Sequence, residues 1–194
     1  MRHTCVLFIA ATALLAAPRA ARADGYIAPA LGVTFGNPSA QGRANFVFDL
    51  GWLPRREPLG VELDVTYAPS FFGNAGPYGE NNVTTFMGNV IFAGGSERRF
   101  GRRGGSSMRP YLSGGLGVMH ETVTTSNAAN KLSNNDLGVN AGIGVMGVTR
   151  RNIGIRVDLR YFRDLTDHTA GNTTNIDFGA FHFWRGSIGV MLGF

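Results

Sequence analysis

Eight segments of the sequence alternate strictly between apolar and polar residues, and this period of two constrains the fold more than any other feature. In IGIRVDLRY, residues 153–161, apolar or aromatic side chains occupy every odd-numbered position, and glycine or charged residues occupy every even-numbered one. Successive side chains of a β-strand point to opposite faces, so the pattern predicts strands with one apolar face. The expected strands are residues 26–35, 44–53, 59–67, 84–93, 110–123, 136–147, 153–162 and 185–194.

The expected strands are long, and their connections alternate in character. Strands of soluble proteins average about 5–6 residues, whereas a tilted strand needs about 9–11 residues to cross a bilayer. Tight connections at 54–58 and 150–152 alternate with longer polar ones at 69–82, 127–135 and 166–175, which is typical of transmembrane barrels. The sequence therefore predicts an all-β fold, an eight-stranded antiparallel up-and-down transmembrane β-barrel with both termini at the tight-turn end.

The N-terminal region has the three parts of a secretory signal peptide. Arg2 precedes an apolar run from Cys5 to Ala17, and the stretch closes on the A-x-A pattern of residues 21–23. The apolar run is too short for an uncleaved membrane anchor. We expect a signal peptide over residues 1–23 and one barrel domain over residues 24–194.

Removal of this peptide changes what the composition implies. The only cysteine, Cys5, would leave with it, so we expect no disulfide, thiol nucleophile or thiolate metal site in the exported protein. The formal charge of +5 includes three arginines of the peptide, and its loss leaves a charge of about +2. The sequence therefore gives no reason to expect a nucleic-acid partner.

Alternation alone does not decide whether the apolar face meets lipid or, as in a lipocalin-like barrel, an internal cavity. Lipid is favoured because the polar face is rich in glycine and serine, which suits the narrow interior of an eight-stranded barrel. Aromatic residues near strand ends also suit the two interfacial girdles of a membrane barrel. These aromatic residues are Phe35, Trp52, Tyr67, Phe92, Tyr111, Tyr161, Trp184 and Phe194. We expect the wall that meets lipid to include Phe46, Leu63, Val157 and Val190.

The last ten residues, RGSIGVMLGF, place apolar side chains at Ile188, Val190, Leu192 and Phe194, where the sequence ends. This pattern resembles the C-terminal signature of bacterial outer-membrane proteins, although Gly186 stands where another apolar residue is usual. The segments RPYLSGGLGV and GIRVDLRYF resemble strands of the OmpA-like and OmpW-like small barrels. The resemblance implies a place in the bacterial outer membrane, contact with its lipids, and recognition of the last strand by the barrel-assembly machinery.

Charged residues on the polar faces of three expected strands form the main candidate site. An isolated charge in a low-dielectric interior is very costly, so these side chains should pair inside the lumen. The expected network comprises Asp49, Glu62, Asp64, Arg156, Asp158 and Arg160. We interpret it as a plug that rigidifies the barrel, and the resemblance to small barrels filled by such networks supports this. A narrow gated polar channel and a catalytic carboxylate pair are the alternatives.

Other motifs give no reason to expect a cofactor, a metal or a catalytic site. GIGVMG, residues 142–147, matches a dinucleotide-binding glycine pattern but lies inside a strand with no helix after it. A simpler interpretation is that Gly142 and Gly144 make room for side chains in the lumen. Lipid A deacylases of the PagL type carry a His-x-Ser pair, which His120, His168 and His182 all lack. No metal-ligand spacing is present either, so we expect no enzyme.

The pairs Arg55-Arg56, Arg98-Arg99, Arg102-Arg103 and Arg150-Arg151 fall in connections at the tight-turn end. They are interpreted as solvated turns or as contacts with anionic headgroups of the inner leaflet. The whole pattern predicts a structural or surface-interacting barrel, with possible extracellular partners for its Asn-rich loops. A narrow channel for small hydrophobic or ionic solutes is the alternative, and a lipid-modifying enzyme is the least favoured class.

Overall fold

The computed structural model describes nine stretches of the chain, and every regular element in them is a β-strand. The described residues are 24–36, 39–54, 57–73, 78–94, 98–100, 106–125, 131–148, 152–165 and 181–194. No helix capable of spanning a membrane occurs among them. The expected signal peptide, residues 1–23, lies outside the described residues.

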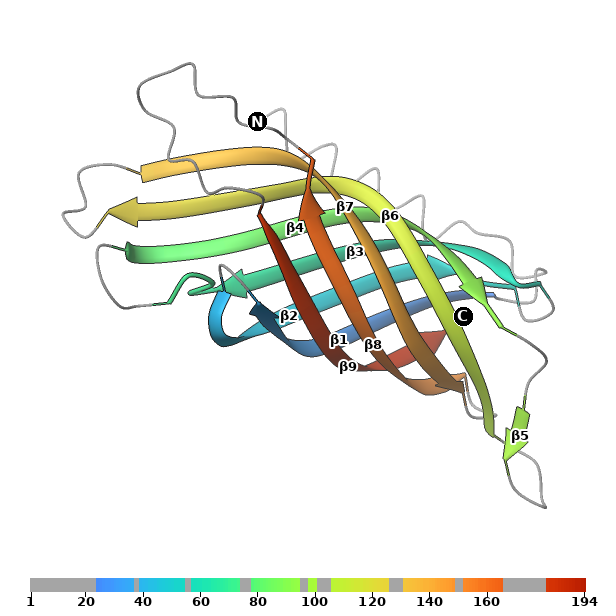
Figure 1. The fold of residues 1–194 in the computed structure, drawn as a ribbon. Helices are drawn as coiled ribbons and strands as arrows, with labels where there is room; N and C mark the ends of the chain where they lie inside the picture. The colour runs from blue at the N-terminus through green and yellow to red at the C-terminus, as the bar shows by residue number, and fades with distance from the viewer. Residues whose placement is uncertain are drawn as a thin grey trace, which may run out of the picture.

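The strands form one antiparallel sheet that closes on itself (Figure 1). Each strand from β1 to β4 and from β6 to β9 pairs with its neighbour in the chain, and the pairs β1–β9 and β4–β6 complete the ring. The fold is therefore a closed eight-stranded barrel to which the short β5 adds on β6. The strands are β1 (Gly25–Gly36), β2 (Ser39–Trp52), β3 (Leu59–Pro69), β4 (Tyr78–Ala93), β5 (Arg98–Phe100), β6 (Ser106–Thr125), β7 (Lys131–Val148), β8 (Ile153–Asp164) and β9 (His182–Gly193).

The first and last strands close the barrel. Tyr26 pairs with Gly193 at one end of the β1–β9 ladder, and Phe35 pairs with Trp184 at the other. A closed sheet leaves no edge strand, which is what a bilayer requires because it offers no partner to an exposed backbone group. We call the end where β1 begins and β9 ends the terminal end, and the opposite end the loop end.

The short strand β5 was not expected from the sequence. Residues 98–100 fall between the expected strands 84–93 and 110–123, and the structure pairs them with the start of β6. Arg98 pairs with Met108, and Phe100 pairs with Ser106. β5 pairs with the start of β6 at the terminal end, beyond the end of β4 (Figure 1). The described residues of this connection therefore extend the β-structure beyond the end of β4.

Three strands are longer than expected at the loop end. β4, β6 and β7 have 16, 20 and 18 residues and reach further than their neighbours at that end (Figure 1). Residues 78–82 and 131–135 were expected in loops, and this expectation was wrong. The ladder continues through polar pairs such as Asn82 with Thr122 and Asn134 with Glu121. Apolar alternation stops there, because the outward face of this extension lies beyond the hydrocarbon core, and so the sequence pattern ends before the strands do.

The outer face of the barrel is apolar. Phe46, Leu63, Val157 and Val190 all point outward, and each is about half exposed in the absence of lipid. Phe35, Trp52, Tyr67, Phe92, Trp184 and Phe194 are also exposed, and Tyr161 is half-buried. The expectation for Tyr111 was wrong, because it shares its face of β6 with Ser113 and lies buried in the lumen.

Glycine on the inner face makes room for large side chains. A Cβ atom added at Gly144 would lie 2.4 Å from Cζ of the Tyr111 ring, and one at Gly51 would lie 2.3 Å from Cζ of the Tyr26 ring. Real Cβ atoms do not approach other atoms this closely. The glycines therefore let two tyrosine rings lie flat against the opposing strands.

The core of the protein is its lumen, where two apolar clusters enclose a charged layer. The first cluster lies at the terminal end and contains Tyr26, Ala28, Leu53, Ile91, Ala93, Tyr111, Met146 and Met191. The second lies at the loop end and contains Ala68, Phe71, Val83, Met87, Met119, Phe162, Phe181 and Phe183. Rings of Phe162 and Phe183 stack with centroids 4.8 Å apart. Each end of the charged layer is therefore covered by packed hydrocarbon.

Candidate functional site

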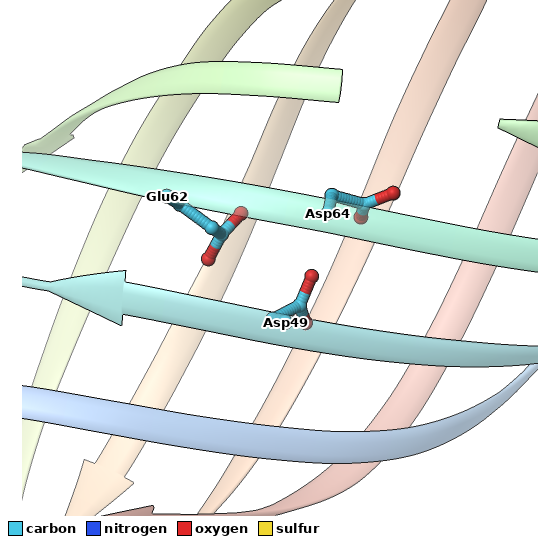
Figure 2. Close-up of side chains that lie close together, drawn as sticks. All are labelled: Asp49, Glu62 and Asp64. Carbon is cyan, nitrogen blue, oxygen red and sulfur yellow. The ribbon is translucent and has the colours of Figure 1, made fainter. Parts of the chain in front are cut away.

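The six residues expected in the charged layer come from three strands. Asp49 comes from β2, Glu62 and Asp64 come from β3, and β8 supplies two arginines and an aspartate. Asp49 pairs directly with Asp64 across the β2–β3 ladder. Figure 2 shows the carboxyl group of Asp49 pointing toward those of Glu62 and Asp64. Each of the six residues expected in the network is at most 4% exposed.

Arg156 connects three carboxylates. Its guanidinium donates to both oxygens of Glu62, through Nη1 to Oε2 and through Nη2 to Oε1 at 3.1 Å. Its Nε atom lies 3.2 Å from Oδ2 of Asp158, and Nη1 lies 3.3 Å from Oδ2 of Asp49. Charge-assisted bonds of this kind are about twice as strong as neutral ones. Arg156 therefore joins β8 to β2 and β3 across the lumen.

Arg160 makes a second set of contacts further along β8. Its Nη2 atom lies 2.5 Å from Oε1 of Glu62 and 3.3 Å from Oδ2 of Asp158. Its Nη1 atom lies 3.2 Å from Oδ2 of Asp64. Glu62 thus lies between two guanidinium groups, and Asp158 bridges them from their own strand.

The structure adds Arg185 of β9, which the sequence reasoning missed. Its Nη1 and Nη2 atoms donate to the two carboxylate oxygens of Asp64, at 2.9 and 2.5 Å, and Nη1 also donates to the Thr66 hydroxyl. The side chain is fully buried. Arg185 shares the face of Ser187 on its strand, so the alternation that places Ile188 outward is the signal that could have found it.

Two tyrosines cover the charged layer on its terminal side. Tyr26 donates its hydroxyl to Glu62 at 2.5 Å, and Tyr111 donates to Asp158 at 3.0 Å. The Tyr111 hydroxyl also accepts a bond from Nε of Arg156, at 2.8 Å. The rings lie 5.9 and 5.0 Å from the carbon of this guanidinium, within cation–π range.

This chemistry suits a structural network better than a catalytic or metal site. Asp49, Glu62 and Asp64 each offer an oxygen atom within 4.8 Å of the others, a spacing that could hold a cation. Three guanidinium groups already lie against these carboxylates, so a metal ion would have to displace or repel them. A catalytic carboxyl pair would need access to substrate, but both ends of the layer are covered by apolar clusters.

A second group of carboxyls lies in the lumen at the loop end. Glu121, Asp136 and Asp164 are all buried, on β6, β7 and β8. Glu121 lies beyond Val118 and Leu137, the last apolar pair of β6 and β7 that faces outward, and is therefore outside the membrane-spanning part of the barrel. Its burial, together with the charges of Asp136 and Asp164, raises the pKa of Glu121 to about 7.

The structure describes the side chains of the expected assembly residues but not those of the expected arginine pairs. Ile188, Val190, Leu192 and Phe194 are exposed on the outer face of β9 and its end. Their recognition by an assembly machinery stays a prediction. The side chains of the four expected arginine pairs lie outside the described residues, although Arg98 and Arg99 belong to β5.

Comparisons with known proteins agree with this geometry. Residues 6–185 match the family model described as outer membrane protein beta-barrel domain. No curated protein is similar enough in sequence to count as a relative. Among solved structures, the fold is similar to that of Neisserial surface protein A, with a TM-score of 0.60 and 14% identity over 88% of this chain and 96% of that chain.

Two further solved structures are similar at a lower level. The N-terminal β-barrel domain of Pseudomonas aeruginosa OprF has a TM-score of 0.51 and 16% identity, over 89% of this chain and 100% of that one. A major outer membrane protein from Thermus thermophilus has a TM-score of 0.51 and 13% identity, over 88% and 99% of the two chains. At these identities the likeness concerns the fold alone.

Proposed function

Because the chain belongs to the family of the outer membrane protein beta-barrel domain and lies in the bacterial outer membrane, we propose that it is a structural and surface-interacting barrel with a plugged polar lumen. In such barrels short turns face the periplasm and longer loops face the cell exterior. The terminal end then faces the periplasm, and the loop end faces outward. Outer-membrane lipids surround the apolar wall.

The layered arrangement of side chains in the lumen is the main support for a plugged barrel. Arg156, Arg160 and Arg185 extend from β8 and β9 to carboxylates on β2 and β3, so their side chains cross the interior. An eight-stranded barrel is just wide enough for its side chains to fill it. Any ion moving along the axis would also have to pass the two apolar clusters, which offer it no replacement for its hydration shell.

The extension of β4, β6 and β7 supports a role at the cell surface. These strands continue beyond their last outward-facing apolar residues and carry polar residues on the outward face, including Asn82, Thr84 and Asn135. The projecting ends of these three strands can present polar groups and the connected loops to partners outside the cell. Its contacts with extracellular molecules are part of this proposal.

We also propose the route by which the chain reaches the membrane. Export requires the signal peptide expected at residues 1–23, and insertion uses the outward residues of β9 as the assembly signal. Phe194→Ala should lower the fraction of folded protein in outer membranes of cells while leaving refolding of the purified chain into detergent micelles unchanged. Equal losses in both assays would show that Phe194 stabilises the barrel rather than guides its assembly.

Planar-bilayer recording on the refolded protein tests the plug. We expect no discrete conductance steps from the unaltered barrel. Arg185→Ala, which removes one crossing side chain, should introduce short openings, whereas Arg163→Ala on the exposed face of β8 should not. Regular conductance steps in the unaltered protein would contradict the plug and favour the narrow polar channel.

A further inference from the structure

Three polar side chains on the outward face of β6 and β7 form a constellation that the lumen does not explain. His120 lies on β6, and Ser133 and Asn135 lie on β7. Nδ1 of His120 is 2.7 Å from Oδ1 of Asn135. Its other ring nitrogen, Nε2, is 3.4 Å from Oγ of Ser133 and 3.3 Å from Oγ1 of Thr122. A hydroxyl, an imidazole and an amide therefore follow one another in hydrogen-bonding order.

The contact with Asn135 determines which ring nitrogen of neutral His120 carries the hydrogen. A carboxamide oxygen only accepts hydrogen bonds, so Nδ1 of His120 must be the atom that carries the hydrogen. Nε2 then has a free lone pair and accepts from a hydroxyl. A general base needs this tautomer in order to take a proton from a nucleophilic hydroxyl, with a third group orienting the ring.

Of the two hydroxyls near Nε2 of His120, that of Ser133 is the accessible one and is therefore assigned as the nucleophile. Both hydroxyls lie at similar distances from Nε2, but Thr122 is buried whereas Ser133 is exposed. Distances of about 3.4 Å are long for a bond in a working complex, and such contacts commonly shorten when substrate binds. Ser133 is therefore the hydroxyl that a molecule outside the barrel could reach.

The height of the constellation on the barrel indicates what that molecule would be. His120 and Asn135 pair two residues beyond Val118 and Leu137, the last apolar pair that faces outward, which places them about 7 Å further along the strands. The polar zone on each side of the hydrocarbon core is about 5–8 Å thick. Acyl ester groups of lipids belong to this polar zone, which the three side chains reach.

We propose that Ser133, His120 and Asn135 form a hydrolase site that cleaves acyl esters of outer-leaflet lipids. Ser133 is the nucleophile, His120 is the general base, and Asn135 is a positioning residue. The proposal goes beyond the structural role and uses no residue of the lumen. It differs from the expectation of no enzyme, which was drawn from residues adjacent along one strand.

The reaction needs water and no other co-reactant. Oγ of Ser133 bonds to the ester carbonyl carbon while its proton passes to Nε2 of His120. The tetrahedral adduct then breaks its bond to the alcohol oxygen, which takes that proton and leaves. Water, deprotonated by the same nitrogen, attacks the acyl-serine, so that the fatty acid is released and Ser133 regains its hydrogen.

The test is acyl release by the protein refolded in detergent micelles. One set of micelles contains phosphatidylethanolamine and the other contains lipopolysaccharide, and free fatty acids are measured by mass spectrometry. We expect release from one of them to fall at least tenfold in Ser133→Ala and in His120→Ala. His182→Ala, an outward histidine of β9 at the same end, is the matched control and should keep the full rate. A shift in electrophoretic mobility on boiling shows that each variant is folded.

Two further measurements separate catalysis from a structural role. A fluorophosphonate, which reacts with activated serines, should label the peptide that contains Ser133. Asn135→Ala should lower kcat more than KM and change the pH profile of the rate, because the histidine loses its fixed tautomer. Release that is equal in Ser133→Ala and the unaltered protein, no release from either lipid, or a label on Thr122 would each overturn the proposal.

Discussion

Arg185 of β9 donates to both carboxylate oxygens of Asp64 of β3, a residue 121 positions earlier in the chain. The two strands lie on different sides of the ring, so this bidentate pair crosses the lumen rather than following the wall. Both side chains are completely buried. The pair therefore joins the first half of the barrel to its last strand through the interior.

Loss of one partner of this pair should be costly. Removing one member of a buried ion pair leaves the other charge without compensation, at a cost of about 3–5 kcal/mol. We expect Arg185→Ala and Asp64→Ala each to lower the free energy of unfolding by this amount, measured by urea titration in detergent. Arg163→Ala, on the exposed face, should change it by less than about 0.5 kcal/mol. The double variant Asp64→Leu with Arg185→Leu should be more stable than either single variant, and an additive loss would contradict this.

Gly144→Ala should destabilise the barrel through a clash with a tyrosine ring. The added Cβ would lie 2.4 Å from Cζ of Tyr111, so the ring that holds Asp158 and Arg156 would have to move. Overpacking of this kind costs about 1–3 kcal/mol. Gly147→Ala is the control on the same strand, because its Cβ would meet nothing closer than 3.8 Å. Equal unfolding free energies for the two variants would show that Gly144 is not needed for packing.

The stability of the barrel should depend on pH through Glu121. Its burial beside Asp136 and Asp164 raises the pKa of Glu121 to about 7 from an ordinary value of 4.5. Because the folded state prefers the protonated form, this stabilising contribution is complete below about pH 4.5 and is lost as pH rises through about 7. We expect the unaltered protein to lose about 2–3 kcal/mol over this range relative to Glu121→Gln. Parallel pH profiles of unfolding free energy for the two proteins would refute this.

A charge on the apolar wall should prevent insertion. Val157 lies outward in the middle of β8, and arginine at such a lipid-facing site costs about 2–4 kcal/mol at the bilayer midplane. Val157→Arg should therefore lower the folded fraction in lipid vesicles, measured by electrophoresis without boiling. Asn82→Arg, on the polar extension of β4, should fold like the unaltered protein. If Val157→Arg folded as well, the wall at this position would not face hydrocarbon.

Most of the fold could be predicted from the sequence, because alternation depends only on whether a residue faces lipid or lumen. The same parity placed Glu62, Arg156 and Arg160 on the inner face before any pairing was known. Arg185 was not included in the expected network, because the strand was recognised from the apolar residues that follow Arg185. Tyr111 was assigned by aromatic character instead of parity, which put it on the wrong face.

The constellation around His120 could not be predicted, because its members meet through the register of two strands. Ser133 and Asn135 were expected in a loop, since the polar extension of β6 and β7 has no apolar alternation that would indicate a strand. A search for His and Ser two residues apart on one strand therefore missed a hydroxyl supplied by the next strand. The length of the β6–β7 ladder, rather than any motif, brings these side chains together.

The pairing of Tyr26 with Gly193 means that almost the whole chain must be made before its first strand can find its lasting neighbour. Contacts between such distant residues form slowly, because a long loop must close before any hydrogen bond is gained. A chain truncated before β9 would not give a smaller barrel. It would give an open sheet with two unsatisfied edges, which is a substrate for aggregation or for the proteases of the periplasm.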